Sequence, residues 1–546
     1  MSRRGDEAAR ATQQEPSGDT PEQHAGQGPG VRPVPAAQAA SPTAAGGLGL
    51  HSTAGRWVLL GTVLGSAVAM IDGTVVNVAL PTIGRDFGVG VAALQWTITA
   101  YTLTLAAFIL VGGALGDHYG RRRIFVIGVV WFAVASLLSG IAPNATALIL
   151  ARALQGVGGA LLTPGSLAII QATFRPEDRA PAIGLWSGLS GVAVAIGPFV
   201  GGYLIEVASW RWIFLINLPV VAAVVFIAQR HVPESRDPGA TGHIDYAGAL
   251  LVALGLGAFV FGLIEGPVLG WTSAGVLATL IGGVAVLVAF VVVELRREHP
   301  MLPLDIFRSR QFSGANAVTF LVYGALGGSL FLIPLQLQQV LDYSPIEAGI
   351  SLLPVTIVML AFSARAGRLS QRIGPRLPMT LGPIVAGLGL ALLSLVGAGD
   401  SYVTTFLPAV LVFSAGLTLT VAPLTAAVLS AVAVEHAGIA SAVNNSVARA
   451  AGLIAVAALP VAAGITGSTY LHPAALSAGY HSAMLIAGVL CASGGVLALV
   501  TIPGTLPHVR RKPAEPAPEE CYSCALDATP LTGASTETES ARAKAA

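Results

Sequence analysis

Apolar stretches of roughly twenty residues recur fourteen times along the chain, each of about the length that a helix needs to cross the hydrocarbon layer. Short polar loops separate them. Backbone N–H and C=O groups have no water to bond in lipid, so each stretch is expected to be an α-helix. The pattern predicts an all-α polytopic membrane protein. The predicted spans are 57–81, 96–116, 124–142, 146–171, 182–206, 212–229, 246–267, 273–295, 314–337, 347–367, 377–398, 402–430, 438–464 and 482–504.

Arginine falls almost entirely in alternate loops. Positively charged loop residues are retained on the cytoplasmic side of a membrane, so these loops are predicted to face inward. The inner loops hold Arg121, Arg122, Arg123, Arg175, Arg179, Arg230, Arg236, Arg296, Arg297, Arg308, Arg310, Arg365, Arg368, Arg372 and Arg376. The predicted outer loops offer only Arg85 and Arg211. Both termini are therefore expected in the cytoplasm.

Composition supports a membrane protein, because only 10% of the residues are charged, whereas a soluble domain has about 25%. The net charge of +1 gives no indication of a nucleic-acid partner. Arginine greatly outnumbers lysine and the chain is rich in alanine and glycine, which suggests a high-GC bacterium. Cys521 and Cys524 form a lone CxxC, and a metal site would need two further ligands, so no metal is predicted.

An internal duplication divides the chain. The loop GALGDHYGRRR after the second predicted span is similar to GRLSQRIGPR after the tenth. We therefore predict a six-helix bundle over 56–230, an inserted two-helix segment over 231–312 and a second six-helix bundle over 313–504. The ends, 1–55 and 505–546, are rich in small and polar residues without apolar periodicity and are predicted to be disordered cytoplasmic tails. Parallel repeats of this kind are typical of one large transporter class.

Further motifs accompany the duplicated loop. The fourth predicted span contains RxxQG, formed by Arg152, Gln155 and Gly156. The fifth has a glycine and proline motif made of Gly184, Gly197, Pro198, Gly201 and Gly202, with Ala193 where the motif has another glycine. Together with 71–81 and 210–219, these motifs resemble those of the major facilitator superfamily, and within it the fourteen-helix drug:proton antiporters. The resemblance covers about 57–504 and is strongest to the antibiotic exporters of actinomycetes.

The resemblance implies alternating access powered by the proton gradient, without a cofactor. Asp72 lies inside an apolar span, where an ionised carboxylate is costly, so we expect it to take up and release a proton. Arg152 is predicted to lie at a similar depth and to face the same cavity. We expect it to oppose protonation of Asp72 when close, and to permit protonation when the helices separate. The alternative is that the two charges merely neutralise each other for insertion.

The family loop implies a cytoplasmic gate formed by Gly113, Asp117, Gly120, Arg121 and Arg122. Asp117 is interpreted as a latch that breaks easily at a wet surface. The glycines of the fifth span either seal the cavity against proton leak or only allow close helix packing. Polar and aromatic side chains within spans are candidates for lining the substrate cavity, and they are Asn77, Tyr101, Gln155, Asn316, Asn444 and Arg449. For Arg449, binding an anionic group and a structural role are both open.

Rival classes lack their motifs. The chain has no GxxxxGK[ST] loop for ATP, and neither GxSxG nor HExxH for an intramembrane enzyme. We predict a secondary transporter whose partners are protons, lipid and a small amphipathic compound, with an aromatic polyketide as the first candidate, and a monomer suffices because one chain holds both bundles. The alternatives are a proton-coupled importer of a small organic solute and a transport-dead sensor or scaffold. With Asp72 as the one acid deep in a span, cargo is expected to be neutral, anionic or singly charged.

Overall fold

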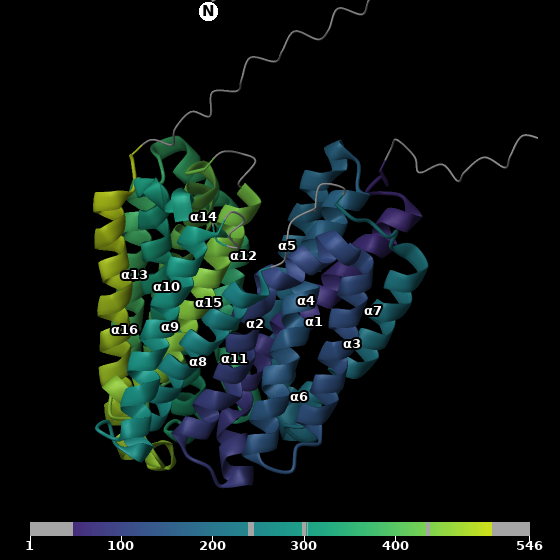
Figure 1. Ribbon diagram of the computed structural model, residues 1–546. Coiled ribbons are helices and arrows are strands. Elements are labelled where there is room, and N and C mark those ends of the chain that lie inside the picture. Colours follow the sequence, from purple (N-terminus) through teal and green to yellow (C-terminus); the bar gives the residue numbers. More distant parts are fainter. Residues whose placement is uncertain (1–46, 238–244, 298–301, 303, 433–436, 505–546) are drawn as a thin grey trace, which may run out of the picture. The chain divides into compact units, whose positions relative to one another are not determined.

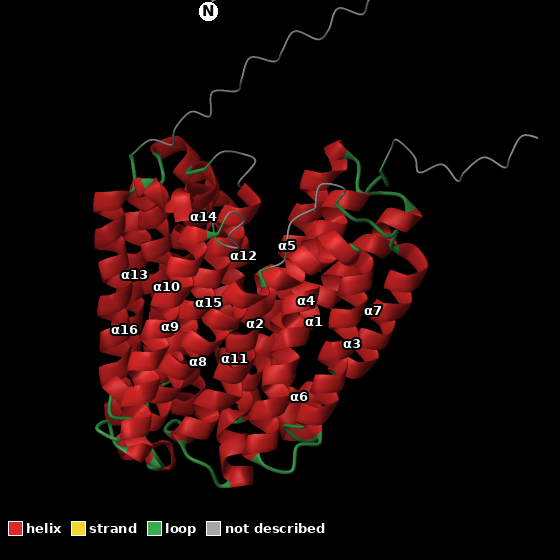
Figure 2. Cartoon of the chain, viewed as in Figure 1, coloured by secondary structure: helices red, strands yellow, loops and turns green. Residues whose placement is uncertain are grey.

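The computed structural model describes residues 47–237, 245–297, 302, 304–432 and 437–504. Within these ranges the chain is helical and contains no β-strand (Figure 2). Fourteen segments are long and apolar enough to cross a membrane, which confirms the predicted fold class. Residues 1–46 and 505–546, most of the two predicted tails, lie outside the described residues, as do Cys521 and Cys524.

The helices follow one another through short loops (Figure 1). In chain order they are α1 (Thr53–Phe87), α2 (Val91–Tyr119), α3 (Arg121–Gly140), α4 (Ala145–Thr173), α5 (Pro176–Val207), α6 (Trp212–Leu215), α7 (Asn217–His231), α8 (Tyr246–Leu269), α9 (Ala274–Arg296), η1 (Leu304–Arg308), α10 (Arg310–Gln339), α11 (Pro345–Ser351), α12 (Leu353–Ile373), α13 (Arg376–Leu393), η2 (Tyr402–Phe406), α14 (Leu407–Ser430), α15 (Ala437–Ala462), η4 (Thr469–Leu471) and α16 (Pro473–Thr501).

Two predicted spans are each divided into two α-helices. The sixth splits into α6 and α7 around Ile216, and the tenth into α11 and α12 around Leu352. A proline comes after each break within three residues, Pro219 and Pro354 respectively. Proline has no N–H for the helical ladder and its ring clashes with the preceding turn, which explains why an apolar run did not give one continuous helix.

The last helix begins nine residues before the predicted span, at Pro473 instead of 482. Its added turns contain polar side chains, and the ring of His481 hydrogen-bonds the carbonyl of Ser394 on a neighbouring segment, at 3.2 Å. A polar residue that finds such a partner can continue a helix beyond the apolar run, which a hydropathy pattern does not reveal.

The first bundle consists of α1–α7 and has its own apolar core. Buried side chains from α1, α3, α4 and α7 meet there, among them Val58, Phe125, Leu162 and Val224. The second bundle, α10–α16, is built around Phe331, Leu390, Phe413 and Met484. In both, α-helices approach closely at glycines, as is usual in lipid, where small residues permit close backbone contact.

The inserted pair, α8 and α9, packs on both bundles through α8. Leu256, Val260 and Ile264 of α8 form one apolar cluster with Leu453 of α15, and Trp96 of α2 packs against it. The indole N–H of Trp96 also donates to the carboxylate of Glu265, at 3.0 Å. The inserted segment is therefore a structural part of both halves and not a separate unit.

The prediction of a disordered tail over 1–55 is wrong for its last residues. α1 begins at Thr53 with Ser52 as its N-cap, and Leu48 exchanges backbone hydrogen bonds with Thr173 and Arg175, where α4 ends and α5 begins. The backbone N–H of Leu50 donates to Asp178 at 3.0 Å. Backbone pairing with a distant segment orders these residues without any apolar periodicity. Similarly, α10 begins at Arg310, three residues before the predicted second bundle.

We predict that Gly416→Val destabilises the second bundle. Gly416 of α14 faces the backbone of Ala386 on α13, and a side chain there would meet the Ala386 Cα at 2.6 Å. Overpacking of this kind typically costs about 1–3 kcal/mol. Thermal unfolding of the purified protein in detergent should show a lower midpoint. Gly275→Val on α9 is the matched control, since a side chain there meets nothing within 4 Å. Equal midpoints for the two variants would contradict the packing described.

Candidate functional site

Two opposite charges meet in the middle of the first bundle. Asp72 of α1 is fully buried, and Arg152 of α4 is 1% exposed. The Arg152 Nη1 donates to the Asp72 Oδ2, and the Arg152 Nε donates to the carbonyl of Thr97 on α2, at 3.1 Å. An ion pair withdrawn from water persists only when further hydrogen bonds satisfy it, and this pair has them.

Gln155 completes the environment of the carboxylate. It lies one turn after Arg152, and its Nε2 donates to the Asp72 Oδ1 at 2.7 Å and to the Ser136 Oγ at 2.8 Å. Its Oε1 accepts from Arg152 at 2.6 Å. Asn217 of α7 also donates to the Ser136 Oγ, at 3.3 Å. The network thus joins α1, α2, α3, α4 and α7, and the spacing RxxQG places both of its polar side chains on the same face of α4.

Tyr101 covers the ion pair. Its ring centroid lies 4.3 Å from the Arg152 Cζ, and its hydroxyl donates to the carbonyl of Ala69 at 3.1 Å. The expectation that Asp72 and Arg152 face a shared cavity is therefore wrong for this state, because both side chains are enclosed. The depth inferred from residue spacing correctly put the two side chains at one level. The sequence does not show that a tyrosine from α2 would lie over them.

The predicted gate loop is held by an ion pair and hydrogen bonds to residues of the first half of the chain. Asp117 accepts from Arg121, with Nη2 at 2.7 Å and Nε at 2.8 Å. The carboxylate of Glu234, after α7, accepts from the backbone N–H of Arg122 at 3.0 Å and of Arg123 at 3.2 Å. A carboxylate at the start of α3 is favoured by the helix dipole. Among the described residues these bonds do not reach the second bundle, so a latch between bundles stays a prediction.

Gly120 is needed where α2 turns into α3. Its φ is +115°, a conformation that side chains disfavour, and an added Cβ would lie 2.8 Å from the carboxyl carbon of Glu234. Gly113 packs instead against Pro164 of α4. Glu234 was missed in the sequence, although an acid beside a loop rich in arginine was a signal for it.

The glycines of the α5 motif are tightly packed at one end of the helix and unpacked at the other. Gly197 and Gly201 face α1, and Gly202 faces α11, each without room for a side chain. Gly184 has open space around it. The motif residue Pro198 lies at the close contact, where Gly349 of α11 meets its carbonyl. Close packing therefore accounts for one half of α5, whereas the half near the arginine-rich loops lacks a tight partner.

The two bundles are joined at the end opposite the arginine-rich loops. The amide of Gln95 on α2 donates to the carbonyl of Val456 on α15, at 2.7 Å. The amide of Gln338 on α10 donates to the carbonyl of Val78 on α1, at 2.8 Å. A continuous apolar core including Val78 and Leu80 runs into the second bundle there. The described state is closed at this end.

The remaining cavity candidates fall into two groups. Asn316 of α10 and Asn444 of α15 are bonded to each other at 3.2 Å, with Thr319 as a further acceptor for Asn444 at 2.7 Å. Their amides hold two helices together. Asn77 of α1 is half-buried and makes no hydrogen bond with the described residues, and the same holds for Arg449 of α15. The first pair is occupied structurally, whereas the other two side chains remain available.

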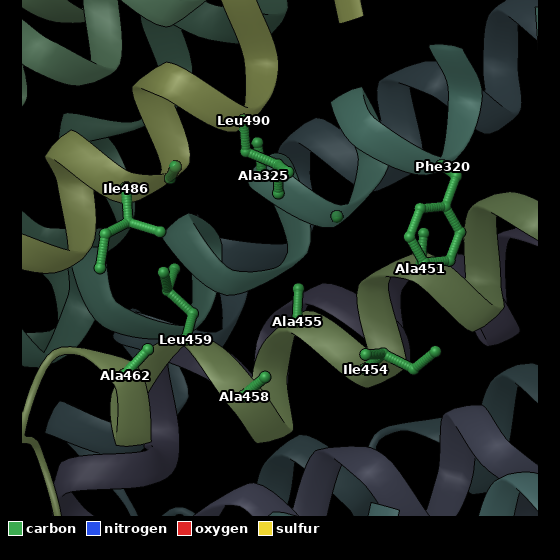
Figure 3. Close-up of a pocket in the computed structure, with 12 residues that line it drawn as sticks. Phe320, Ala325, Ala451, Ile454, Ala455, Ala458, Leu459, Ala462, Ile486 and Leu490 are labelled. Atoms are coloured by element: carbon green, nitrogen blue, oxygen red, sulfur yellow. The ribbon is translucent and has the colours of Figure 1, made fainter. Parts of the chain in front are cut away.

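A separate groove lies between α10, α15 and α16. Phe320, Ile454, Leu459, Ile486 and Leu490 are among its lining residues, all of which are apolar (Figure 3). Its volume of about 180 Å³ is below the roughly 300–1,000 Å³ of sites that enclose a drug-sized ligand. Without a polar group it offers nothing to orient a ligand.

Comparison with known proteins gives a consistent picture. The family model for the Major Facilitator Superfamily matches residues 62–456. The puromycin resistance protein of Streptomyces alboniger is 37% identical over 417 residues, covering 76% of this chain and 82% of that one. The tetracenomycin C resistance and export protein of Streptomyces glaucescens is 32% identical over 403 residues, covering 74% and 75%. A crystal structure of a POT family transporter with a bound peptide conjugate aligns with a TM-score of 0.62 at 13% identity, covering 81% and 95%, and this likeness concerns the fold alone.

We predict that Gln338→Ala shifts the protein toward a state open at the end opposite the arginine-rich loops. The substitution removes one hydrogen bond between bundles, and a net contribution of about 1 kcal/mol corresponds to roughly a five-fold change in populations. Pulsed electron paramagnetic resonance between spin labels at Pro143 and Ala474, both exposed near this end, should show more of the longer distance.

Gln336→Ala is the matched control. Its amide lies on the same helix but donates to Val396 within the second bundle, at 2.9 Å. The control should leave the distance distribution unchanged. An equal shift in both variants would mean that Gln338 supports α10 and not the closure between bundles.

Proposed function

This chain belongs to the Major Facilitator Superfamily of secondary transporters, and from that premise we propose that it is a proton-coupled antiporter exporting an amphipathic organic compound. An antibiotic or another secondary metabolite, such as an aromatic polyketide, is the proposed cargo. The observation that carries proton coupling is the buried carboxylate of Asp72, held by Arg152 and Gln155 in the middle of the first bundle. The proposed energy source is the proton gradient, without a cofactor.

Relatives support export over the alternative of import. One is named for puromycin resistance, another for tetracenomycin C resistance and export, and a third for methylenomycin A resistance. A transporter confers resistance by moving the compound out of the cell. We further propose that the arginine-rich end faces the cytoplasm, since basic loops are retained there. In that orientation both termini are cytoplasmic, the described state is closed toward the exterior, and cargo enters from inside.

The position of the ion pair changes how protonation is coupled to transport. Asp72 and Arg152 both belong to the first bundle, so rocking of the two bundles as rigid bodies does not separate them. Access to Asp72 must instead come from a local change. Tyr101 lies over Arg152 and is anchored by a single hydrogen bond to Ala69. We propose that movement of Tyr101 opens the pair to a proton.

Cargo charge is limited because Asp72 is the one acidic side chain near the middle of a span among the described residues. One proton entering releases about 2.3 kcal/mol per 100 mV and about 1.36 kcal/mol per pH unit. For a neutral solute, 100 mV and one pH unit together support roughly a 500-fold gradient, since 1.4 kcal/mol is about tenfold. A dication leaving against one proton would move net charge outward against the voltage. Neutral, anionic or singly charged cargo is therefore favoured.

We predict that Asp72→Asn abolishes uphill export. Asparagine preserves the size of the side chain but carries no titratable group, so it cannot deliver a proton. A sensitive host that expresses the wild-type chain should tolerate more puromycin or tetracenomycin C, the compounds named for two relatives. The variant should return the inhibitory concentration to that of the host alone. In everted vesicles acidified inside, only the wild type should couple cargo uptake to proton release.

Asp86→Asn is the matched control. Asp86 lies on the same helix but near its far end, 44% exposed, where it pairs with Arg211 at 3.1 Å. This variant should keep its export activity. If folded, inserted Asp72→Asn protein still extrudes cargo uphill at the wild-type rate, proton coupling through Asp72 is wrong.

A second prediction concerns the cargo. The same host should gain no resistance to a dicationic dye, because one proton cannot drive a dication outward. Growth assays with a dication and a neutral analogue would measure this directly. Robust resistance to the dication would contradict coupling to one carboxylate.

A further inference from the structure

Arg449 lies at the middle of α15. It is 12 residues from the first residue of the helix and 13 from the last. At 1.5 Å per residue, its backbone therefore lies about 18 Å from either end of the helix. A lipid headgroup does not reach that depth. α15 packs against α2, the helix whose Tyr101 ring lies over Arg152, so Arg449 belongs to a helix next to the proton site although it is part of the other bundle.

Arg449 differs sharply from Arg152 in its surroundings. Arg152 bonds Asp72, Gln155 and the carbonyl of Thr97. The Nε of Arg449 is enclosed and has no hydrogen-bond partner among the described residues. None of the ion pairs in this part of the chain includes it. A cation without a partner inside an apolar span is costly, and such residues in membrane proteins mark ligand or ion pathways.

The helices around α15 supply no carboxylate for it. α15 contacts α2, α8, α10, α14 and α16. Helices α10, α14 and α16 contain neither aspartate nor glutamate. The acid of α2, Asp117, is at the arginine-rich end and pairs with Arg121, and the acid of α8, Glu265, accepts from Trp96. With Asp72 neutralised by Arg152, the region retains one uncompensated positive charge.

We propose that Arg449 binds an acidic group of the cargo, which would be an organic anion with a carboxylate, enolate or phenolate. The inference rests on the proposed export function and specifies its substrate class. Arginine suits this task, because its planar fork can donate two parallel hydrogen bonds to a carboxylate. The neighbouring cluster of Leu256, Val260 and Leu453 is apolar, and a low-dielectric surrounding strengthens such a pair. Because α15 packs against α2, a bound anion would also lie next to the bundle that holds the proton site.

Two matched probes test the assignment. 2-Naphthoate and 2-naphthamide share a ring system and size but differ in charge. Isothermal titration calorimetry of the full chain in neutral detergent should show tighter binding of the naphthoate, on the order of tenfold, as expected for a charge-assisted hydrogen bond. Arg449→Gln should reduce naphthoate binding to the level of the naphthamide. Arg449→Lys should retain part of the preference, and both variants should bind the naphthamide as the wild type does.

Arg365→Gln on α12 is the control, because the Arg365 Nη1 already donates to the carbonyl of Ala361 in its own helix, at 2.6 Å. It should leave the preference intact. Equal affinities of the wild type for the two probes, no binding of the naphthoate at millimolar concentration, or a preference lost only with Arg365 would each overturn the proposal. The wild-type comparison needs no variant to fold. Because binding is measured without transport, continued uphill export by the Asp72→Asn variant would refute the proposed proton coupling and leave this inference standing.

Discussion

A carboxylate inside an apolar helix is the constraint on which the first bundle depends. Asp72 can be accommodated there because Arg152 and Gln155 satisfy both of its oxygens, and Gln155 in turn bonds Ser136. Removing one partner would leave a buried charge uncompensated, which is far more costly than the pair is favourable. The helices that carry these groups are therefore fixed in rotation and depth relative to one another. The ion pair of Asp72 and Arg152, with its hydrogen bonds, therefore makes the first bundle rigid.

Parting of the two bundles and protonation of Asp72 depend on different parts of the structure. Besides the shared apolar core, the described contacts between the bundles include glutamine amides and the Tyr470 hydroxyl donating to backbone carbonyls, and glycines of α5 against α11. None of these polar contacts involves a buried charge. Such contacts are weak individually and can exchange for water when the bundles part. Protonation, by contrast, depends on a side chain inside one bundle. Communication between the two must pass through contacts between the bundles, and α2, whose Tyr101 covers the charged network, packs against α15 of the second bundle.

Periodicity and depth can be predicted from the sequence, whereas a partner that is distant in the chain cannot. Apolar length gives the fourteen spans, and residue spacing places Asp72 and Arg152 at one level, where they meet. The cover formed by Tyr101 and the donation of Gln338 to Val78 depend on the rotation of packed helices, which one sequence does not reveal. The helix breaks before Pro219 and Pro354 could have been predicted from these prolines, but the apolar runs around them were interpreted as continuous spans.

The inserted helix α8 gives the molecule unequal flanks. It touches α2 of one half and α15 of the other, so protein spans the boundary on that flank. On α5 and α12, side chains such as Leu185, Leu189, Leu360 and Phe362 are exposed instead. A compound dissolved among the acyl chains would therefore meet protein across the boundary on the α8 flank, and exposed apolar side chains on the flank of α5 and α12. The inserted helix pair thus restricts entry from the membrane to the flank formed by α5 and α12.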